Sequence, residues 1–163
     1  MNNAATSATE TREISNEKIF DAPRELVWNA WTDPEHIKQW WGPNGFTTTT
    51  KHFDFQPGGQ WLHTMHGPDG TDYPNEITYK VIDEPSRIEY EHGDCPLFYT
   101  TVIFEDLDGK TKLSMRMLFN TSEDRDDTEK RYGAIEGLEQ TLGRLTEFLS
   151  ESGAISTGYS AIQ

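Results

Sequence analysis

The stretch FEDLDGKTKLSM, residues 104–115, contains the strongest hairpin signal in the chain. Asp108-Gly109 is a pair that two-residue hairpin turns prefer, and it stands between two strand-like segments. So short a turn joins antiparallel strands, because parallel strands need a long crossover connection. We therefore predict an antiparallel pair of strands around this turn.

The two-residue period of this pair extends back towards Phe46 and forward to Phe119. Turn signals rich in Gly and Pro divide this region into short segments. The six predicted strands are Thr47–Phe55, Gln60–His66, Glu76–Ile82, Arg87–Glu91, Phe98–Glu105 and Lys112–Phe119. Consecutive short strands with close turns imply an antiparallel meander.

Helical periodicity flanks the meander on both sides. A first strand, Glu13–Phe20, precedes two short helices, of which Pro23 opens one and Asp33 caps the other. After the meander we predict one long helix from near Thr128 to before Gly153. Its apolar stripe consists of Tyr132, Ile135, Leu138, Leu142, Leu145 and Leu149. The stripe must face the sheet, so the fold class is α+β: a curved antiparallel sheet wrapped around a long C-terminal helix, with a hollow between them.

The composition indicates one soluble domain of 163 residues with a net charge of −14. We expect a disordered arm over residues 1–12, the domain over residues 13–152 and a flexible tail over residues 153–163. Such acidity disfavours nucleic acid and anionic membranes as partners, since both attract basic surfaces. The chain has neither a signal-peptide pattern nor an apolar run of membrane-spanning length, and this predicts a cytoplasmic protein.

The sequence has no recognisable catalytic or metal-binding motif. Cys95 has no identifiable base partner, and GxSxG, GxGxxG and P-loop patterns are absent. His63 and His66 are three apart on a predicted strand, so their side chains point to opposite faces and cannot chelate one ion. We expect no metal and no cofactor.

Two strands carry candidate pocket residues. Trp61, His63 and Met65 share one face of their strand, which we place inward because it is the bulkier face. His63 is then either a histidine that is hydrogen-bonded in the core or a group that orients a ligand. The methionines of the last strand, Met115 and Met117, suit either a pocket for variable apolar ligands or an ordinary core.

Four tryptophans lie between residues 28 and 41. We expect Trp28 and Trp31 to be structural and to attach the first helix to the edge of the sheet. Trp40 and Trp41 stand just before Gly42-Pro43, where the second helix should meet the pocket mouth. Adjacent helical residues point about 100° apart, so we predict that one of the pair lines the entrance. Core packing of both is the alternative.

Four stretches taken together resemble a known family: VWNAWTDPEHIKQWWGP, FDFQPGGQW, MHGPDGTDYPNEI and GLEQTLGRLTEFL. The family is the bacterial, single-domain branch of the activators of heat-shock protein ATPase, within the START-like (SRPBCC) superfamily. The resemblance runs from about Ile14 to Leu149 and implies a helix-grip, Bet v-like fold. It also implies a carrier or sensor of small hydrophobic molecules. Eukaryotic relatives stimulate a chaperone ATPase with the help of a further domain, and other branches are enzymes, including polyketide cyclases.

The chain departs from this family in the long helix. The family commonly has Trp after the helix glycine, whereas Leu138 follows Gly137 here, and a smaller side chain would enlarge the hollow. Gly133 and Gly143 lie in the same predicted helix, each at a cost of about 1 kcal/mol relative to alanine. Close approach to the sheet or room for a ligand would explain these glycines.

The leading hypothesis is therefore non-enzymatic binding of a small hydrophobic or aromatic molecule. The predicted ligand-binding residues are Trp40, Trp41, Trp61, His63, Met65, Tyr79, Tyr90, Phe98, Met115, Met117, Ile135 and Leu138. One alternative is an enzyme of the polyketide cyclase type, with His63 as general acid or base assisted by Tyr79 or Tyr90. Another is an interaction module that acts on a chaperone. The oligomeric state is left open.

Overall fold

The computed structural model describes residues 11–93 and 97–152. The predicted tail and Cys95 lie outside the described residues, as does the predicted arm apart from residues 11 and 12. Arg12 extends the pairing of the first strand, because its carbonyl accepts a hydrogen bond from the Phe119 amide at 2.8 Å.

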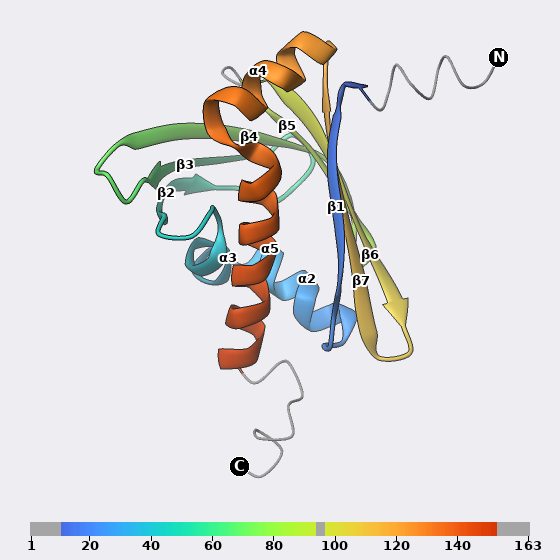
Figure 1. Ribbon diagram of the computed structural model, residues 1–163. Helices are drawn as coiled ribbons and strands as arrows, with labels where there is room; N and C mark the ends of the chain where they lie inside the picture. Colours follow the sequence, from blue (N-terminus) through green and yellow to red (C-terminus); the bar gives the residue numbers. More distant parts are fainter. Residues whose placement is uncertain (1–10, 94–96, 153–163) are drawn as a thin grey trace, which may run out of the picture.

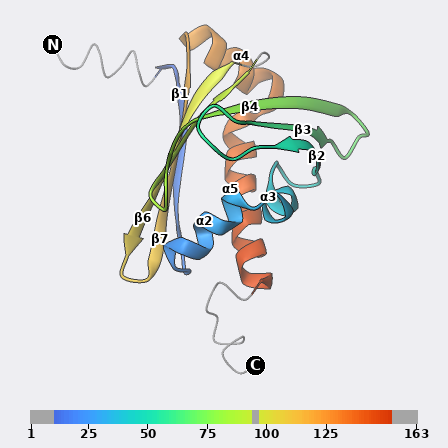
Figure 2. The same ribbon diagram turned by 180° about the vertical axis from the view of Figure 1, so that it is seen from behind.

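Within residues 11–93 and 97–152, seven strands and four helices follow the predicted order, with one helix more than predicted at the C-terminal end. They are β1 (Glu13–Phe20), α2 (Arg24–Thr32), α3 (Pro34–Trp40), β2 (Thr47–Phe53), β3 (Gln60–His66), β4 (Asp72–Asp83), β5 (Arg87–His92), β6 (Phe98–Leu107), β7 (Lys110–Phe119), α4 (Ser122–Tyr132) and α5 (Ala134–Glu151). The strands form one antiparallel sheet in the order β1-β7-β6-β5-β4-β3-β2, which confirms the meander. The α+β helix-grip prediction is also confirmed: α5 lies across the curved sheet, with α2 and α3 beside it (Figure 1). In the reverse view β2, β3 and β4 pass in front of α5 (Figure 2).

The hairpin that joins β6 to β7 turns at the predicted pair. Asp108 has φ 55° and Gly109 has φ 87°, so both residues adopt the left-handed conformation that this class of turn requires. The strands then pair from Leu107 opposite Lys110 to Phe98 opposite Phe119. A local sequence signal thus sets the register of the longest strand pairing in the sheet.

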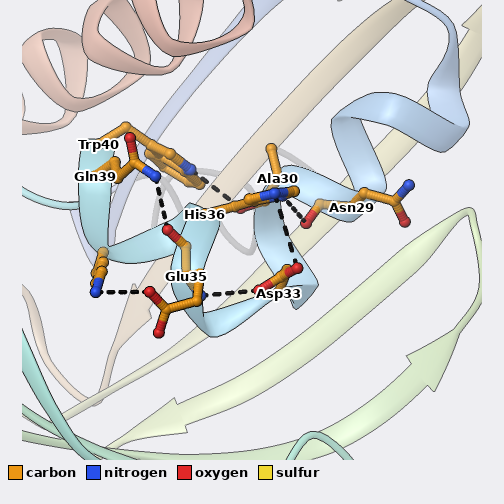
Figure 3. Close-up of polar contacts among 8 residues, drawn as sticks. Asn29, Ala30, Asp33, Glu35, His36, Gln39 and Trp40 are labelled. Atoms are coloured by element: carbon orange, nitrogen blue, oxygen red, sulfur yellow. Dashed lines mark hydrogen bonds and ion pairs between the residues drawn. The ribbon is translucent and has the colours of Figure 1, made fainter. Parts of the chain in front are cut away.

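The junction of α2 and α3 is held by short-range hydrogen bonds (Figure 3). The Asp33 carboxylate accepts from the Glu35 amide at 2.9 Å, which confirms the predicted cap, and Pro34 occupies the first turn. The Trp40 indole donates to the Ala30 carbonyl at 3.1 Å and thereby ties the end of α3 to α2. Pro23 is the N-cap of α2 and not its first helical residue.

The long C-terminal helix is present as α5, but its predicted start near Thr128 is wrong, because the helical region is broken in two. Gly133 has φ 61° and ψ 45°, a left-handed conformation that ends α4, and α5 begins at the next residue. The Glu129 carboxylate accepts from the Ile135 amide at 2.7 Å and so caps the new helix. Because of the break, Tyr132 and Ile135 are 46% and 45% exposed, and the buried part of the stripe begins at Leu138.

Trp28 and Trp31 are buried structural residues, but they do not attach to an edge of the sheet. Their rings contact Phe104 with centroids 5.0 and 6.0 Å away. Phe104 lies on β6, which is an interior strand between β7 and β5. Trp31 also packs against Trp40 at 5.0 Å, so the two short helices share one aromatic core.

Close packing explains only one of the three glycines in the predicted helix. A Cβ at Gly137 would lie 3.3 Å from Pro43, whereas one at Gly143 would meet no atom within 4 Å. Gly133 serves as the cap between the two helices.

We expect Gly143→Ala to raise the free energy of unfolding by about 1 kcal/mol, because alanine lowers the conformational entropy of the unfolded chain and meets no obstruction in α5. Urea denaturation at neutral pH measures the change. Gly137→Ala is the matched control. It should gain less stability, since its new Cβ would lie close to Pro43. A destabilised Gly143→Ala variant would contradict the open environment of this position.

Candidate functional site

A cavity of about 460 Å³ opens between one end of the sheet and the break between α4 and α5. It is built from seven elements and the loop after α3. The residues that line it are Pro43, Phe46, Met65, Asp72, Tyr73, Pro74, Asn75, His92, Phe98, Met117, Thr128, Arg131, Tyr132 and Ala134. The break at Gly133 thus helps to build the cavity, because the flanking Tyr132 and Ala134 both belong to its wall.

Aromatic and sulfur-containing side chains make up much of the wall. Tyr73 contacts Phe46 with ring centroids 5.9 Å apart and Tyr132 with centroids 6.5 Å apart. Phe98 is stacked on the imidazole of His92 at 4.5 Å with an interplanar angle of 8°. Such a lining of rings and flexible methionines is typical of sites for apolar molecules.

Two hydrogen-bonded side chains supply a polar centre to this wall. His92 Nε2 donates to Asn75 Oδ1 at 2.6 Å, and Asn75 Nδ2 donates to the Tyr73 carbonyl at 2.8 Å. The charged residues of the lining are more exposed: the side chain of Asp72 is 63% exposed and pairs with His66, and that of Arg131 is 61% exposed and pairs with Asp127. Asp72 and Arg131 therefore lie on the solvent side of the cavity, whereas the hydrogen bond between Asn75 and His92 lies deeper in the fold.

His63 lies behind this wall, opposite Asn75 in the register of β3 and β4. The residue is 3% exposed, and its ring is stacked on Trp61 at 3.8 Å. Neither of its ring nitrogens has a hydrogen-bond partner among the described residues. Desolvation by burial, aided by the nearby charge of His92, lowers the pKa of His63 to about 3. The imidazole is therefore neutral at neutral pH.

Tyr79 and Tyr90 form a neighbouring buried pair on β4 and β5. Burial raises the pKa of Tyr90 to about 12 and raises that of Tyr79 further. Both phenols therefore keep their protons at physiological pH. Tyr79 packs edge-on against Phe55 at 4.8 Å, so it belongs to the aromatic core.

A family model described as Activator of Hsp90 ATPase homolog 1-like protein matches residues 21–150. The chain belongs to this family. The structure is similar to that of a protein from Arthrobacter aurescens at 27% identity, with a TM-score of 0.82 and coverage of 87% of this chain and 88% of the other. A protein from Nitrosomonas europaea (20% identity, TM-score 0.79, coverage 88% and 97%) and an AHSA1-like protein from Aeromonas hydrophila (21%, 0.72, coverage 89% and 96%) share the fold. No curated protein matches the sequence.

Within this member of the family, the predicted ligand-binding residues fall into three groups. Met65, Phe98 and Met117 line the cavity. The buried core contains Trp40, Trp61, His63, Tyr79, Tyr90, Met115 and Leu138, and Trp41 packs against that core. Ile135 is 45% exposed and does not line the cavity. The ligand-binding role of all these residues stays a prediction.

The prediction that Trp40 or Trp41 lines the entrance is wrong for this cavity. Trp40 is fully buried, and Trp41 contacts Trp61 with centroids 5.1 Å apart. The wall is instead formed by Pro43 and Phe46, which follow in the loop. The helix ends at Trp40, so the helical angle between the two tryptophans does not apply.

Sequence reasoning missed Asn75 and His92 because the predicted strands were too short. β4 begins at Asp72 and not at Glu76, so Asn75 belongs to the strand and follows its alternation. His92 lies one residue beyond the predicted strand Arg87–Glu91 but is the last residue of β5. Extending the two-residue period by a few positions would have identified both as inward-facing.

Arg144 of α5 fastens the loop that carries Pro43 to the rest of the fold. Its Nη1 donates to the carbonyls of Gly42 at 2.9 Å and Pro43 at 3.1 Å, with a longer contact to Trp41 at 3.4 Å. Its Nη2 donates to the Gln39 carbonyl at 3.2 Å. One guanidinium thus satisfies the carbonyls that the end of α3 leaves unpaired. Arg144 is therefore a positioning residue for the cavity wall.

The described residues contain no group of three His, Cys, Asp or Glu side chains placed to hold a metal ion. In the same part of the chain, no helix combines the length and the apolar character that crossing a membrane requires.

Proposed function

We propose that this protein is a carrier or sensor that binds a small, mainly apolar or aromatic molecule in the cavity at the α4–α5 break. The observation that carries the proposal is the cavity itself: about 460 Å³, lined by aromatic and methionine side chains with few polar groups. Ligand sites in proteins are commonly 300–1,000 Å³ in volume and have this composition. The fold family supports the proposal, since its members share a sheet curved around a helix.

The chemistry of His63 weighs against the polyketide cyclase alternative. A general acid or base works best when its pKa is close to the operating pH. Burial holds the pKa of His63 at about 3, and the imidazole lies behind the cavity wall. The buried phenols of Tyr79 and Tyr90 have raised pKa values, so they are poor proton donors at neutral pH. The properties of His63, Tyr79 and Tyr90 therefore fit a non-enzymatic binding protein better than an enzyme.

We expect Ala134→Phe to abolish ligand binding while the protein stays folded. Ala134 lines the cavity from the first turn of α5, so a benzyl group there occupies the space that a ligand needs. The measurement is the change in melting temperature with biphenyl as the probe. A probe at a hundredfold excess over its Kd stabilises the native state by about 2.7 kcal/mol. Biphenyl should raise the melting temperature of wild type by several degrees and should leave that of Ala134→Phe unchanged.

Ile135→Phe is the matched control for this variant. It adds a similar ring to the adjacent residue, which is exposed and does not line the cavity. The control should bind biphenyl as wild type does. If Ala134→Phe binds equally well, the ligand site lies elsewhere.

Membership of a family described by a chaperone ATPase activator supports a second proposal, a chaperone partner. The cytoplasmic location predicted from the sequence suits both proposals and stays a prediction. Co-sedimentation with a purified chaperone of the Hsp90 class would test the second one, and the cavity-filling Ala134→Phe variant should not affect that contact.

A further inference from the structure

Asn75 is held in a fixed orientation with hydrogen-bonding capacity to spare. Its Oδ1 accepts from His92 and its Nδ2 donates to the Tyr73 carbonyl, both within the described chain. A carboxamide has two N–H groups and two carbonyl lone pairs. One donor and one acceptor are therefore available on a side chain that lines the cavity.

Two histidines adjoin Asn75: His63 lies opposite it on β3, and His92 on β5 donates to it. His63 faces it from β3 and is uncharged at neutral pH, since burial depresses the pKa of its imidazole. The charged side chains of the cavity, Asp72 and Arg131, lie on its exposed side and already have ion-pair partners in His66 and Asp127. Because His92 Nε2 already donates to Asn75, an ionised ligand group at this place would be desolvated without that donor as its partner, which is costly.

We propose that the ligand of this cavity is an uncharged apolar molecule with one hydroxyl group at its inner end, and that Asn75 receives this hydroxyl. A hydroxyl both donates and accepts, which matches the two unused sites of the carboxamide. The aromatic wall around Phe98 and Tyr73 holds the apolar body. This inference rests on the proposed function, because it names the ligand class of the same cavity.

A series of biphenyls that differ at one position tests the inference on wild type. The probes are biphenyl, 4-hydroxybiphenyl, 4-methoxybiphenyl and biphenyl-4-carboxylate, and calorimetry or NMR titration at pH 7 gives the Kd of each. We expect the hydroxyl compound to bind roughly five- to tenfold more tightly than biphenyl, as one additional buried hydrogen bond provides. The methoxy compound keeps the oxygen acceptor but lacks the O–H donor, so its affinity should exceed that of biphenyl by less than the affinity of the hydroxyl compound does. The carboxylate should bind more weakly than biphenyl.

The variant Asn75→Leu tests whether Asn75 is the residue that causes the preference for 4-hydroxybiphenyl over biphenyl. The variant should bind biphenyl at least as well as wild type and should lose the preference for the hydroxyl compound. Thr78→Leu is the matched control on the same strand, because Thr78 pairs with Gln60 on the outer face and should leave the preference intact. The comparison within the probe series on wild type remains decisive even if Asn75→Leu does not fold.

The outcomes separate this inference from the proposed function. If biphenyl binds and Ala134→Phe blocks it, but the hydroxyl compound gains nothing, then the hydroxyl inference is overturned and the binding function stands. Tightest binding of the carboxylate would overturn it in the same way. If none of the probes binds, or if Ala134→Phe blocks none of them, both proposals fail together.

Discussion

Acidification from pH 6.5 towards pH 3 should cost this protein on the order of 4 to 5 kcal/mol of stability through His63 alone. The folded state holds the pKa of this imidazole at about 3, against a reference value of 6.5. Between these values the unfolded chain binds a proton that the native state does not bind. Stability therefore rises with pH across this window and is lost as the pH falls. Well above pH 6.5 the imidazole is neutral in both states and contributes no slope.

Urea denaturation at a series of pH values, on wild type and His63→Phe, measures this effect. At pH 4.5, two units into the window, wild type should have lost about 3 kcal/mol that the variant keeps, in addition to any loss common to both. The readout is the difference in slope, so a constant packing effect of the new ring cancels. His92, whose charge also lowers the pKa of His63, is present in both proteins.

His52→Phe is the matched control, because His52 is exposed on the edge strand β2 and its imidazole is solvated in both states. Its pH profile should follow that of wild type. Parallel profiles for wild type and His63→Phe would show that the buried imidazole does not titrate as its burial requires.

We expect Arg144→Met to lower the free energy of unfolding by about 3 kcal/mol. Each of the carbonyls that the guanidinium contacts is at the end of α3 or in the loop that follows, where the backbone has few other donors. Hydrogen bonds to charged groups contribute about 1.5–3 kcal/mol each. Arg144 is partly exposed and its Nη1 is shared among three carbonyls, so we count the network as about two such bonds at the low end of that range. Methionine preserves much of the apolar stem and removes the donors.

The variant Arg144→Lys tests whether the stabilisation by Arg144 comes from its positive charge or from the geometry of its guanidinium. A single ammonium lacks the planar fork and reaches fewer of these carbonyls, so the variant should lose roughly half as much stability. Lys130→Met on the exposed face of α4 is the control for removing one positive charge from an acidic protein. A stability of Arg144→Met within about 0.5 kcal/mol of wild type, the size of an ordinary surface effect, would rule out this role. Because Pro43 and Phe46 line the cavity, Arg144→Met and Arg144→Lys should also weaken the binding of biphenyl.

Local signals in the sequence were sufficient for the turns and the helix starts. Asp108-Gly109 and Asp33-Pro34 act through their own backbone and side-chain geometry, which does not depend on distant residues. The alternation of Trp61 and His63 correctly predicted their inward face for the same reason. Such features follow from chemistry within a few residues.

The break at Gly133 could not be predicted from the helical pattern. A glycine inside a helix and a glycine that ends one look alike in sequence, and an apolar period on either side favours continuation. The outcome depends on where α4 and α5 can pack, which involves β1 and β7 far away in the chain. One local conformation at Gly133 therefore placed Ile135 on the surface and Ala134 in the cavity wall.

The sequence by itself determined the order of the strands, the family and the inward face of β3, because periodicity and turn chemistry are local properties. Only the tertiary structure decided which inward-facing residues touch one another and which border the cavity. Trp61 meets Trp41 and Phe53 across the core, whereas Met65 on the same face of the same strand lines the cavity. Trp61 and Met65 occupy equivalent places in the alternation of β3. What distinguishes their surroundings is the packing of segments that are remote in the chain.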